Sequence, residues 1–458
     1  MEQLCSESEY IKNMLENEEF KTETEINTNT ELLKNTEKIL KITYDILKLP
    51  ITYIRYKKFL INISKNYKTI EYTEQNIKTY IMLVDFFMLN KQEEIFNYII
   101  NTYIVRQDKY YEQLHLFNPI NYYLLKIIGE DNEISNSTFE YLFKIDVHIS
   151  NEITKLCSKH IKQNILNKCT SIKNLNIKNN RYVLNVNHLS NLEELNISSN
   201  CGVDQKGISE LKLVKILNAN NNCKIKNVNH LNILEELHIS YNCGVNQIGI
   251  SDLLLVKKLN ASLNSKITDV NYLKLLEELN IAEDCEVRQN GILELKFVKK
   301  LDVHGNIHII NVNHLSRLEE LNISEHCGVN QNGITDLKLI KKLNACNNTN
   351  RIDVNHFSNL EELNISNGHD RYLVRDTVLN RPYDGGGVTQ EGIKKLKLIK
   401  ILYAYNNSNI KNVNHLEKLE ELDISEKCGV DQNGISDLKF IKILKACNND
   451  KITQKFKN

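Results

Sequence analysis

Cysteine and histidine recur in this chain at intervals that invite a reading as metal ligands or nucleophiles. Five cysteines occupy one repeated position and Cys223 occupies the matching position of an alternate unit; the five are Cys201, Cys243, Cys285, Cys327 and Cys428. Cysteines in the same phase would lie two strands apart, roughly 10 Å, which is too far for a disulfide or one zinc ion. We therefore predict that these six cysteines are small buried hydrophobic residues.

The histidines are equally regular and point to structure rather than chemistry. They stand in the phrase VNH[LF], at His188, His230, His314, His356 and His415. The sequence holds no GxxxxGK[ST], GxGxxG, GxSxG or HExxH motif, the patterns that bind phosphates, dinucleotides, acyl groups or zinc. We expect a chain that is not an enzyme and that uses no cofactor and no metal.

Charged residues alternate in sign along the chain. Glu235-Glu236 is followed by Lys257-Lys258, and the same alternation runs from Glu193 to Lys442. If each pair precedes a strand, glutamate rows face lysine rows across neighbouring strands, and we interpret them as a solvated structural ladder. Lys plus Arg and Asp plus Glu are both 58. This balance argues against nucleic acid and against an electrostatic membrane-surface binder.

Partner binding is expected where the repeated pattern breaks. The outward positions are otherwise a monotonous series of asparagines, interrupted at His238, at Asp302 with His304, at Tyr403 with Tyr405 and at Lys445. The largest break is an insertion at 368–387, rich in the Tyr and Arg residues that dominate binding energy. The candidate contact residues are Arg371, Tyr372, Arg375, Arg381, Tyr383, Tyr403 and Tyr405.

These positions are set by a long internal repeat. The phrase LEEL ends at Leu195, Leu237, Leu279, Leu321 and Leu363 at intervals of 42 residues, and again at Leu422 after 59. A second phrase of the type K-[IK]-L-[ND]-[AV] interleaves with it, placing leucines at 217, 259, 301, 343, 402 and 444. With Leu175 this makes about thirteen units over 171–455, each of the form L-x-x-L-x-[IAV]-x-x-N.

The repeat resembles the leucine-rich-repeat family. Its 20-residue units, such as 222–240, look like the short intracellular type of phosphatase regulators, and its 22-residue units, such as 201–217, look like the cysteine-containing type of F-box proteins. The resemblance implies an α/β leucine-rich-repeat solenoid in which each unit adds one parallel strand to a concave face. We predict strands centred on the repeated leucines, from 175 to 444.

Two further repeated residues carry expectations about turns. An asparagine follows the strand leucine by five residues and should bond exposed backbone, at Asn180, Asn200, Asn222, Asn242, Asn264, Asn306, Asn348, Asn407 and Asn449. Positions 284, 326, 368 and 427 lack it, and we expect local fraying there. Glycine recurs at 207, 249, 291, 333, 392 and 434. We expect these glycines to supply a positive φ.

The region before the repeats differs in composition. We expect residues 1–30 to be disordered, 31–112 to be helical and 113–170 to form a helical linker and N-terminal cap. The phrase LVDFFMLNKQEEIFNYII, within 77–104, resembles the closing helices of a BTB/POZ domain. The fold class is thus a leucine-rich-repeat solenoid preceded by a mainly α-helical region.

Taken together, the sequence favours a non-enzymatic protein–protein interaction module with a protein partner of unknown identity. A helical adaptor before leucine-rich repeats resembles the substrate receptors of cullin-type ubiquitin ligases. In that resemblance the N-terminal region would dock the ligase and the solenoid would hold the target. A structural repeat array without a defined partner and a phosphatase-type regulatory subunit remain alternatives. The near-identical, Asn/Ile/Lys-rich units also resemble leucine-rich-repeat proteins of giant DNA viruses of amoebae. We expect a cytoplasmic protein, in the host cytoplasm if viral, because no apolar run of membrane-spanning length occurs.

Overall fold

The computed structural model describes residue 68, residues 153–367 and residues 387–453. The chain divides into two units between Val183 and Leu184. The segments expected at 1–30 and 31–112, including the BTB-like stretch, lie outside the described residues, as does most of 113–170 and all of the insertion except Gly387.

In the first unit, strand β1 (Lys155–Cys157) pairs in parallel with β2 (Asn174–Asn176), and the short helix α10 (Gln163–Leu166) separates them in sequence. β1 lies in the stretch for which we expected a helical linker and cap. The strand forms because Ile153 and Leu156 have the same three-residue apolar spacing as Leu192 and Leu195 of a later unit, and both are fully buried. The repeat pattern therefore begins before residue 171.

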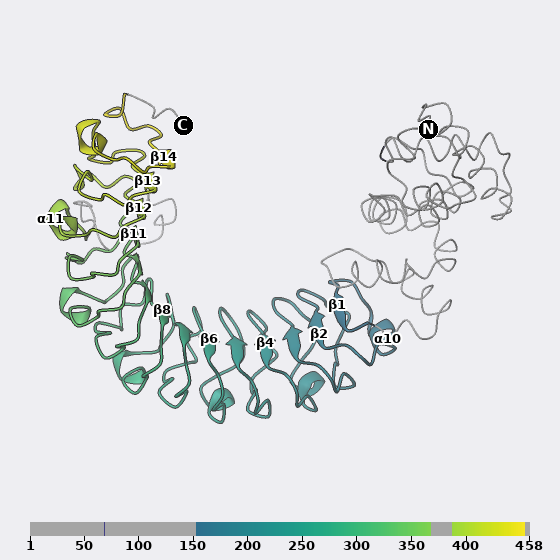
Figure 1. Ribbon diagram of the computed structural model, residues 1–458. Coiled ribbons are helices and arrows are strands. Elements are labelled where there is room, and N and C mark those ends of the chain that lie inside the picture. The colour runs from purple at the N-terminus through teal and green to yellow at the C-terminus, as the bar shows by residue number, and fades with distance from the viewer. Residues whose placement is uncertain (1–67, 69–152, 368–386, 454–458) are drawn as a thin grey trace, which may run out of the picture. The chain divides into compact units, whose positions relative to one another are not determined.

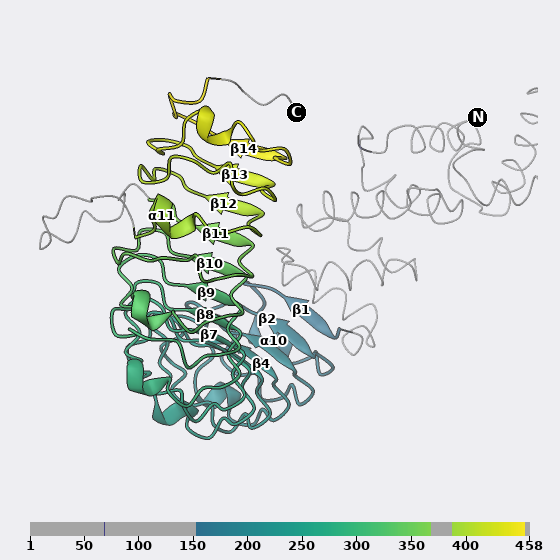
Figure 2. The ribbon, with the colours of Figure 1, turned by 60° about the vertical axis from the view of Figure 1, so that its left-hand side comes forward.

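The second unit is a solenoid of three-residue parallel strands, each paired with the next along the chain (Figures 1 and 2). Each central leucine is in register with the next, as in Leu237↔Leu259. Leu363 is likewise in register with Leu402, so the sheet continues across the insertion. The strands are β3 (Glu194–Asn196), β4 (Ile216–Asn218), β5 (Glu236–His238), β6 (Lys258–Asn260), β7 (Glu278–Asn280), β8 (Lys300–Asp302), β9 (Glu320–Asn322), β10 (Lys342–Asn344), β11 (Glu362–Asn364), β12 (Ile401–Tyr403), β13 (Glu421–Asp423) and β14 (Ile443–Lys445).

The predicted strand positions are confirmed, because β2 to β14 are each centred on a repeated leucine or its equivalent. Figure 1 shows the strands of the second unit on the inner, concave side of its curve, and this bears out the leucine-rich-repeat arrangement. The outer side carries short helical turns, η5 (Lys206–Ile208), η6 (Ile248–Ile250), η7 (Gln289–Gly291), η8 (Gln331–Gly333), α11 (Gln390–Ile393) and η9 (Asn433–Ile435). Within residues 153–367 and 387–453, the helices fall short of the length and apolarity that a membrane span requires.

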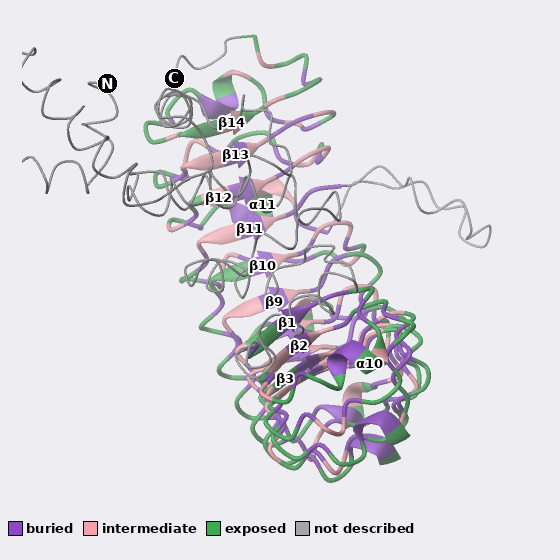
Figure 3. Ribbon diagram, turned by 90° about the vertical axis from the view of Figure 1, so that its right-hand side faces the viewer, coloured by how far each residue is buried: buried purple, intermediate pink, exposed green. Residues whose placement is uncertain are grey.

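The core lies between the strands and the outer turns. Successive side chains of a strand point to opposite faces, so Leu237 and Ile239 face inward with exposures of 1% and 0%, whereas Glu236 and His238 face the concave side. Figure 3 shows the same alternation along the sheet. Burying one such leucine is worth about 1.5–3 kcal/mol, and one three-residue strand could not achieve this alone.

The buried asparagine ladder exists in every second unit only. Asn264 donates its Nδ2 to the carbonyls of Ile239 and Val245 at 2.8 and 3.2 Å, while its Oδ1 accepts the backbone N–H of Lys266 at 3.2 Å. Its buried counterparts are Asn180, Asn222, Asn306, Asn348, Asn407 and Asn449. Each satisfies backbone groups that would be costly to bury without a partner.

The units between them use a different solution, which corrects our expectation. Asn200 and Asn242 are exposed, and the next residue, Cys201 or Cys243, is buried instead. Positions 284, 326 and 427 fall in these cysteine units, where the side chain at that place faces solvent. Their departure from asparagine leaves no buried polar group unsatisfied, so it gives no reason for fraying; position 368 lies outside the described residues.

The prediction for the recurrent glycines is wrong. Among the described glycines only Gly305 has a positive φ, at 65°. The left-handed non-glycine residue lies four places after the strand leucine in eleven described units, where Asn, Ser, Tyr, Leu and Glu adopt φ of 53–65°. Gly249 and Gly333 recur for another reason: a Cβ on them would lie against the carbonyl oxygens of Lys226 and Ile310 in the preceding unit. Close packing between units, rather than backbone conformation, requires glycine there.

Two substitutions separate these explanations. Gly333→Ala should lower the free energy of unfolding by about 1–3 kcal/mol, because the added methyl displaces the Ile310 carbonyl. Gly305→Asn should cost less than about 1 kcal/mol, because Asn179 and Asn221 already adopt this conformation and a Cβ at Gly305 meets Glu283 at an ordinary 3.5 Å. Urea unfolding followed by circular dichroism measures both. A larger loss for Gly305→Asn would contradict the close-packing argument.

Candidate functional site

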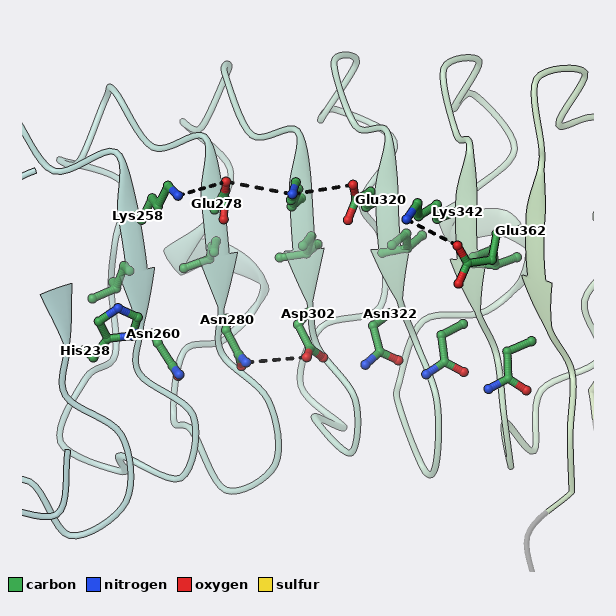
Figure 4. Close-up of a pocket in the computed structure, with 18 of the residues that line it drawn as sticks. His238, Lys258, Asn260, Glu278, Asn280, Asp302, Glu320, Asn322, Lys342 and Glu362 are labelled. Atoms are coloured by element: carbon green, nitrogen blue, oxygen red, sulfur yellow. Dashed lines mark hydrogen bonds and ion pairs between the residues drawn. The ribbon is translucent and has the colours of Figure 1, made fainter. Parts of the chain in front are cut away.

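The concave face of β5 to β12 forms an open groove of about 480 Å³ (Figure 4). Because each strand is three residues long with its leucine turned inward, the first and third residues of every strand project into the groove. The unit repeat thus converts one sequence position into one row of side chains across the sheet. Two such rows line the groove, and a third row lies beside them.

The first row, at the first residue of each strand, alternates glutamate and lysine. The Nζ of Lys258 lies 3.8 Å from Glu236 and 3.4 Å from Glu278, and that of Lys300 lies 3.5 Å from Glu320. The predicted ladder of facing Glu and Lys rows is confirmed. Isoleucines interrupt it at Ile216, Ile401 and Ile443.

The row beside it, one residue before the strands, is also closed by ion pairs. Lys257 donates to Glu235 at 2.6 Å and Lys299 to Glu277 at 2.7 Å. The hydrogen bond to Glu235, followed by its charge, raises the pKa of Lys257, and the same contact lowers the pKa of Glu235. Exposed pairs of this kind add little to stability. Their main effect is that, from β5 to β11, every charge of the two rows already has an ion-pair partner within the chain.

The third strand residues form a row of amide donors. The Oδ1 atoms of Asn260, Asn322 and Asn344 each accept the backbone N–H two residues on at 3.1 Å, closing a turn at the strand end. The oxygen is thereby bonded within the chain, and the NH₂ group faces the groove. Among the described groove asparagines, only Asn280 has an intramolecular acceptor for its Nδ2, Asp302 at 3.4 Å. The sequence analysis treated these asparagines as an uninformative repeat. An asparagine at each strand end is typical of an Asx turn, and this signal would have indicated that the oxygen bonds the backbone while the NH₂ group faces outward.

One interruption of this row is a charged cluster. His304 places Nδ1 2.8 Å from Asp302 and Nε2 3.2 Å from Glu283 in the preceding unit. The hydrogen bond to Asp302, reinforced by the charges of Asp302 and Glu283, raises the pKa of His304 to about 9 despite its partial burial. At neutral pH the imidazole is therefore a cation held between two carboxylates. A second histidine, His238, contacts Glu236 at 2.7 Å.

The titration of His304 gives a test of this cluster. A pKa raised from about 6.5 in the unfolded chain contributes stability that is complete below pH ~6.5 and is lost as pH rises through about 9. NMR of the imidazole should give a midpoint near 9. His304→Gln should remove this part of the pH dependence of unfolding, whereas His326→Gln, at an exposed position, should retain it. A midpoint at or below 6.5 for His304 would show that the cluster does not form.

Of the predicted contact residues, Tyr403 lines the groove at its β12 end. The Nζ of Lys445 lies 5.8 Å from the centre of its ring, and its hydroxyl lies 3.4 Å from Glu421. Partial burial and the nearby carboxylates raise the pKa of Tyr403. The carbonyl of Tyr405, a half-buried residue, accepts the N–H of Asn367 at 2.8 Å. Asn367 is the last described residue before the insertion.

The remaining predicted contact residues, Arg371, Tyr372, Arg375, Arg381 and Tyr383, lie outside the described residues. The insertion ends at Gly387, whose backbone N–H and carbonyl are both hydrogen-bonded to the preceding unit. Its N–H donates to Asn348 and its carbonyl accepts from Ile352, both at 2.7 Å.

The repeated cysteines and histidines have structural positions. The five in-phase cysteines are buried thiols outside any disulfide, as predicted, and burial raises the pKa of Cys243 to about 11 and that of Cys327 to about 12. Cys223 is exposed, so the prediction fails for it: it lies one residue past the buried Asn222, which fills the interior place in that unit. His230, like His314, His356 and His415, donates Nε2–H to a carbonyl 22 residues earlier, which confirms a structural role.

Comparisons with known proteins find distant likenesses among solved structures. No protein-family model and no curated protein matches the chain. Among solved structures, an internalin (InlF) of Listeria monocytogenes strain 4b F2365 is 17% identical with a TM-score of 0.43, covering 75% of this chain and 92% of that one. The functional domain of InlJ from Listeria monocytogenes, which includes a cysteine ladder, is 16% identical with a TM-score of 0.36 over 65% of this chain and 63% of that one. A leucine-rich-repeat protein of Leptospira interrogans is 19% identical with a TM-score of 0.35 over 63% and 76%. Similarity at this level supports no inference about what the chain binds.

Proposed function

We propose that this chain is a non-enzymatic protein-binding module whose concave groove receives the partner. The observation that carries the proposal is the row of amide NH₂ groups whose oxygens are already bonded within the chain. Such groups can donate hydrogen bonds to an incoming ligand in place of solvent. The flanking Glu and Lys rows neutralise each other, so the groove can accept a polar protein surface without a net charge requirement.

We further propose that specificity lies at the β12 end, where Tyr405 is hydrogen-bonded to Asn367, the last described residue before the insertion. Tyrosine and arginine provide most of the energy at protein interfaces, and the asparagine rows contain neither. The place of Tyr403 in the groove and the bond from Asn367 to Tyr405 support this proposal, because both tyrosines then lie near the base of the insertion. The contact set is Arg371, Tyr372, Arg375, Arg381, Tyr383, Tyr403 and Tyr405.

Deletion of residues 369–385 tests the insertion without disturbing the repeat, since it restores the 42-residue spacing between Leu343 and the leucine of β12. The deletion and the pair Tyr403→Ala with Tyr405→Ala should each reduce recovery of the native partner at least tenfold in quantitative affinity purification. Tyr241→Ala is the matched control, because Tyr241 is an exposed tyrosine outside the groove. If both variants recover the partner as well as the unchanged chain does, the specific contact lies elsewhere.

The adaptor role rests on sequence resemblance alone. We propose that the N-terminal region, through the BTB-like segment at 31–112, docks a cullin-type ubiquitin ligase while the solenoid holds the target. Mass spectrometry of proteins captured by the full chain from its native host distinguishes the alternatives. A cullin would favour the adaptor, a phosphatase catalytic subunit would favour a regulatory subunit, and recovery of neither would leave the structural repeat array.

A further inference from the structure

A second surface lies beside the concave face and was not indicated by the breaks in the repeat. It consists of the residues four places before each strand leucine, where a solvated loop would be expected to carry polar side chains. Five successive units instead place an apolar side chain there, and we call this set the lateral stripe: Leu213, Ile233, Leu255, Leu275 and Phe297. Four of these are 37–46% exposed and Ile233 is half-buried.

The stripe is continuous across units. The backbone ladder between units extends two residues before each strand leucine, since Glu235 N–H donates to Lys215 and Lys257 N–H donates to Glu235, each at 2.8 Å. Residues two places further back therefore keep nearly the strand spacing of about 4.8 Å. The guanidinium of Arg317 lies 4.7 Å from the centre of the Phe297 ring, so side chains of this row in neighbouring units touch. Four such steps span roughly 19 Å.

The two borders of the stripe differ in charge. On the concave side runs the closed ion-pair row, including Lys257 with Glu235. On the other side, the residues five places before the strand leucines include exposed lysines at Lys212, Lys274 and Lys296. In the described part of the chain, Lys274 alone of these three has an ion-pair partner, Glu294 at 3.6 Å. Glu210 and Glu294 lie two residues before Lys212 and Lys296, with a buried residue between the members of each pair. The lysines are therefore the charged residues adjacent to the stripe on this side.

The spacing of the stripe fits an α-helix better than a strand. Apolar residues at i, i+4, i+7 and i+11 of a helix advance about 5.4 Å per turn, close to the strand spacing of about 4.8 Å. Alternate residues of an extended peptide advance about 6.6 Å and lose register after two units. About 13 helical residues would cover the 19 Å of the stripe.

We infer that the lateral stripe binds an amphipathic α-helix of a partner protein, with acidic residues along the flank that faces Lys212, Lys274 and Lys296. An exposed apolar stripe at a fixed phase over five units is unusual on a solvated surface. A helix laid along it buries the apolar row, and its acidic flank neutralises the lysine border. None of the five stripe residues lines the groove, so this surface is distinct from it.

The probe is a 15-residue helix-forming peptide with leucines at i, i+4, i+7 and i+11 and glutamates on one flank. The comparison peptide has lysines in place of those glutamates. Fluorescence anisotropy with the full chain should give at least tenfold tighter binding of the glutamate peptide, weakening as salt is raised. Leu255→Asn with Phe297→Asn should weaken binding at least tenfold. Ile248→Asn with Ile307→Asn, two residues 74% and 62% exposed outside the stripe, should leave it unchanged.

A charge reversal makes the test specific. Lys274→Glu with Lys296→Glu should invert the preference so that the lysine peptide binds more tightly, while far-ultraviolet circular dichroism remains that of the unchanged chain. Equal binding of both peptides, or equal loss in the Ile248 and Ile307 variant, would overturn the inference. Sedimentation showing a dimer that Leu255→Asn with Phe297→Asn dissociates would also overturn it, since a second copy would then occupy the stripe.

Discussion

The whole solenoid depends on in-register parallel stacking of one unit on the next. A single strand of three residues has almost no stability, but the register that sets Leu237 against Leu259, and Leu259 against Leu279, turns isolated leucines into one continuous core. The same register fixes everything else at that level of the unit. A residue type repeated in sequence becomes a row in space, and its neighbours in the row are its counterparts 20 or 22 residues away.

Rows of the same residue type have consequences that no single residue has. Alternating Glu and Lys cancel one another along the sheet, so charge contributes little to recognition over the repeated stretch. Asparagines whose oxygen closes the strand end present their NH₂ donors to the outside. The groups available to a ligand are therefore the polar groups of each row that its internal hydrogen bonds and ion pairs do not use. Interruptions such as Tyr403 and the cluster around His304 stand out against that background.

Strand positions were predictable from sequence because they depend on a period, and period is visible in the leucines themselves. The roles of glycine and asparagine were not, because they depend on distances between units. Gly333 is needed where a neighbouring carbonyl comes close, which cannot be read from Gly333 or its sequence neighbours. Asn200 and Asn222 look equivalent in the repeat, because a cysteine follows each of them. In the first unit Cys201 is buried and Asn200 is exposed, whereas in the second unit Asn222 is buried and Cys223 is exposed. The partner of His304 in the preceding unit, Glu283, was likewise hidden by 21 residues of separation.

The alternation of asparagine units and cysteine units has a consequence for how such an array can change in length. Removal of the unit that contains β6 would set two glutamate strands side by side, so that Glu236 would face Glu278 with no lysine between them. Like charges in opposed positions destabilise a sheet. The removal would also join two interiors of the same kind, cysteine beside cysteine. Removal or duplication of a neighbouring pair preserves both patterns. The segment that can be added or removed without disturbing the rows is therefore the pair of units rather than the single unit.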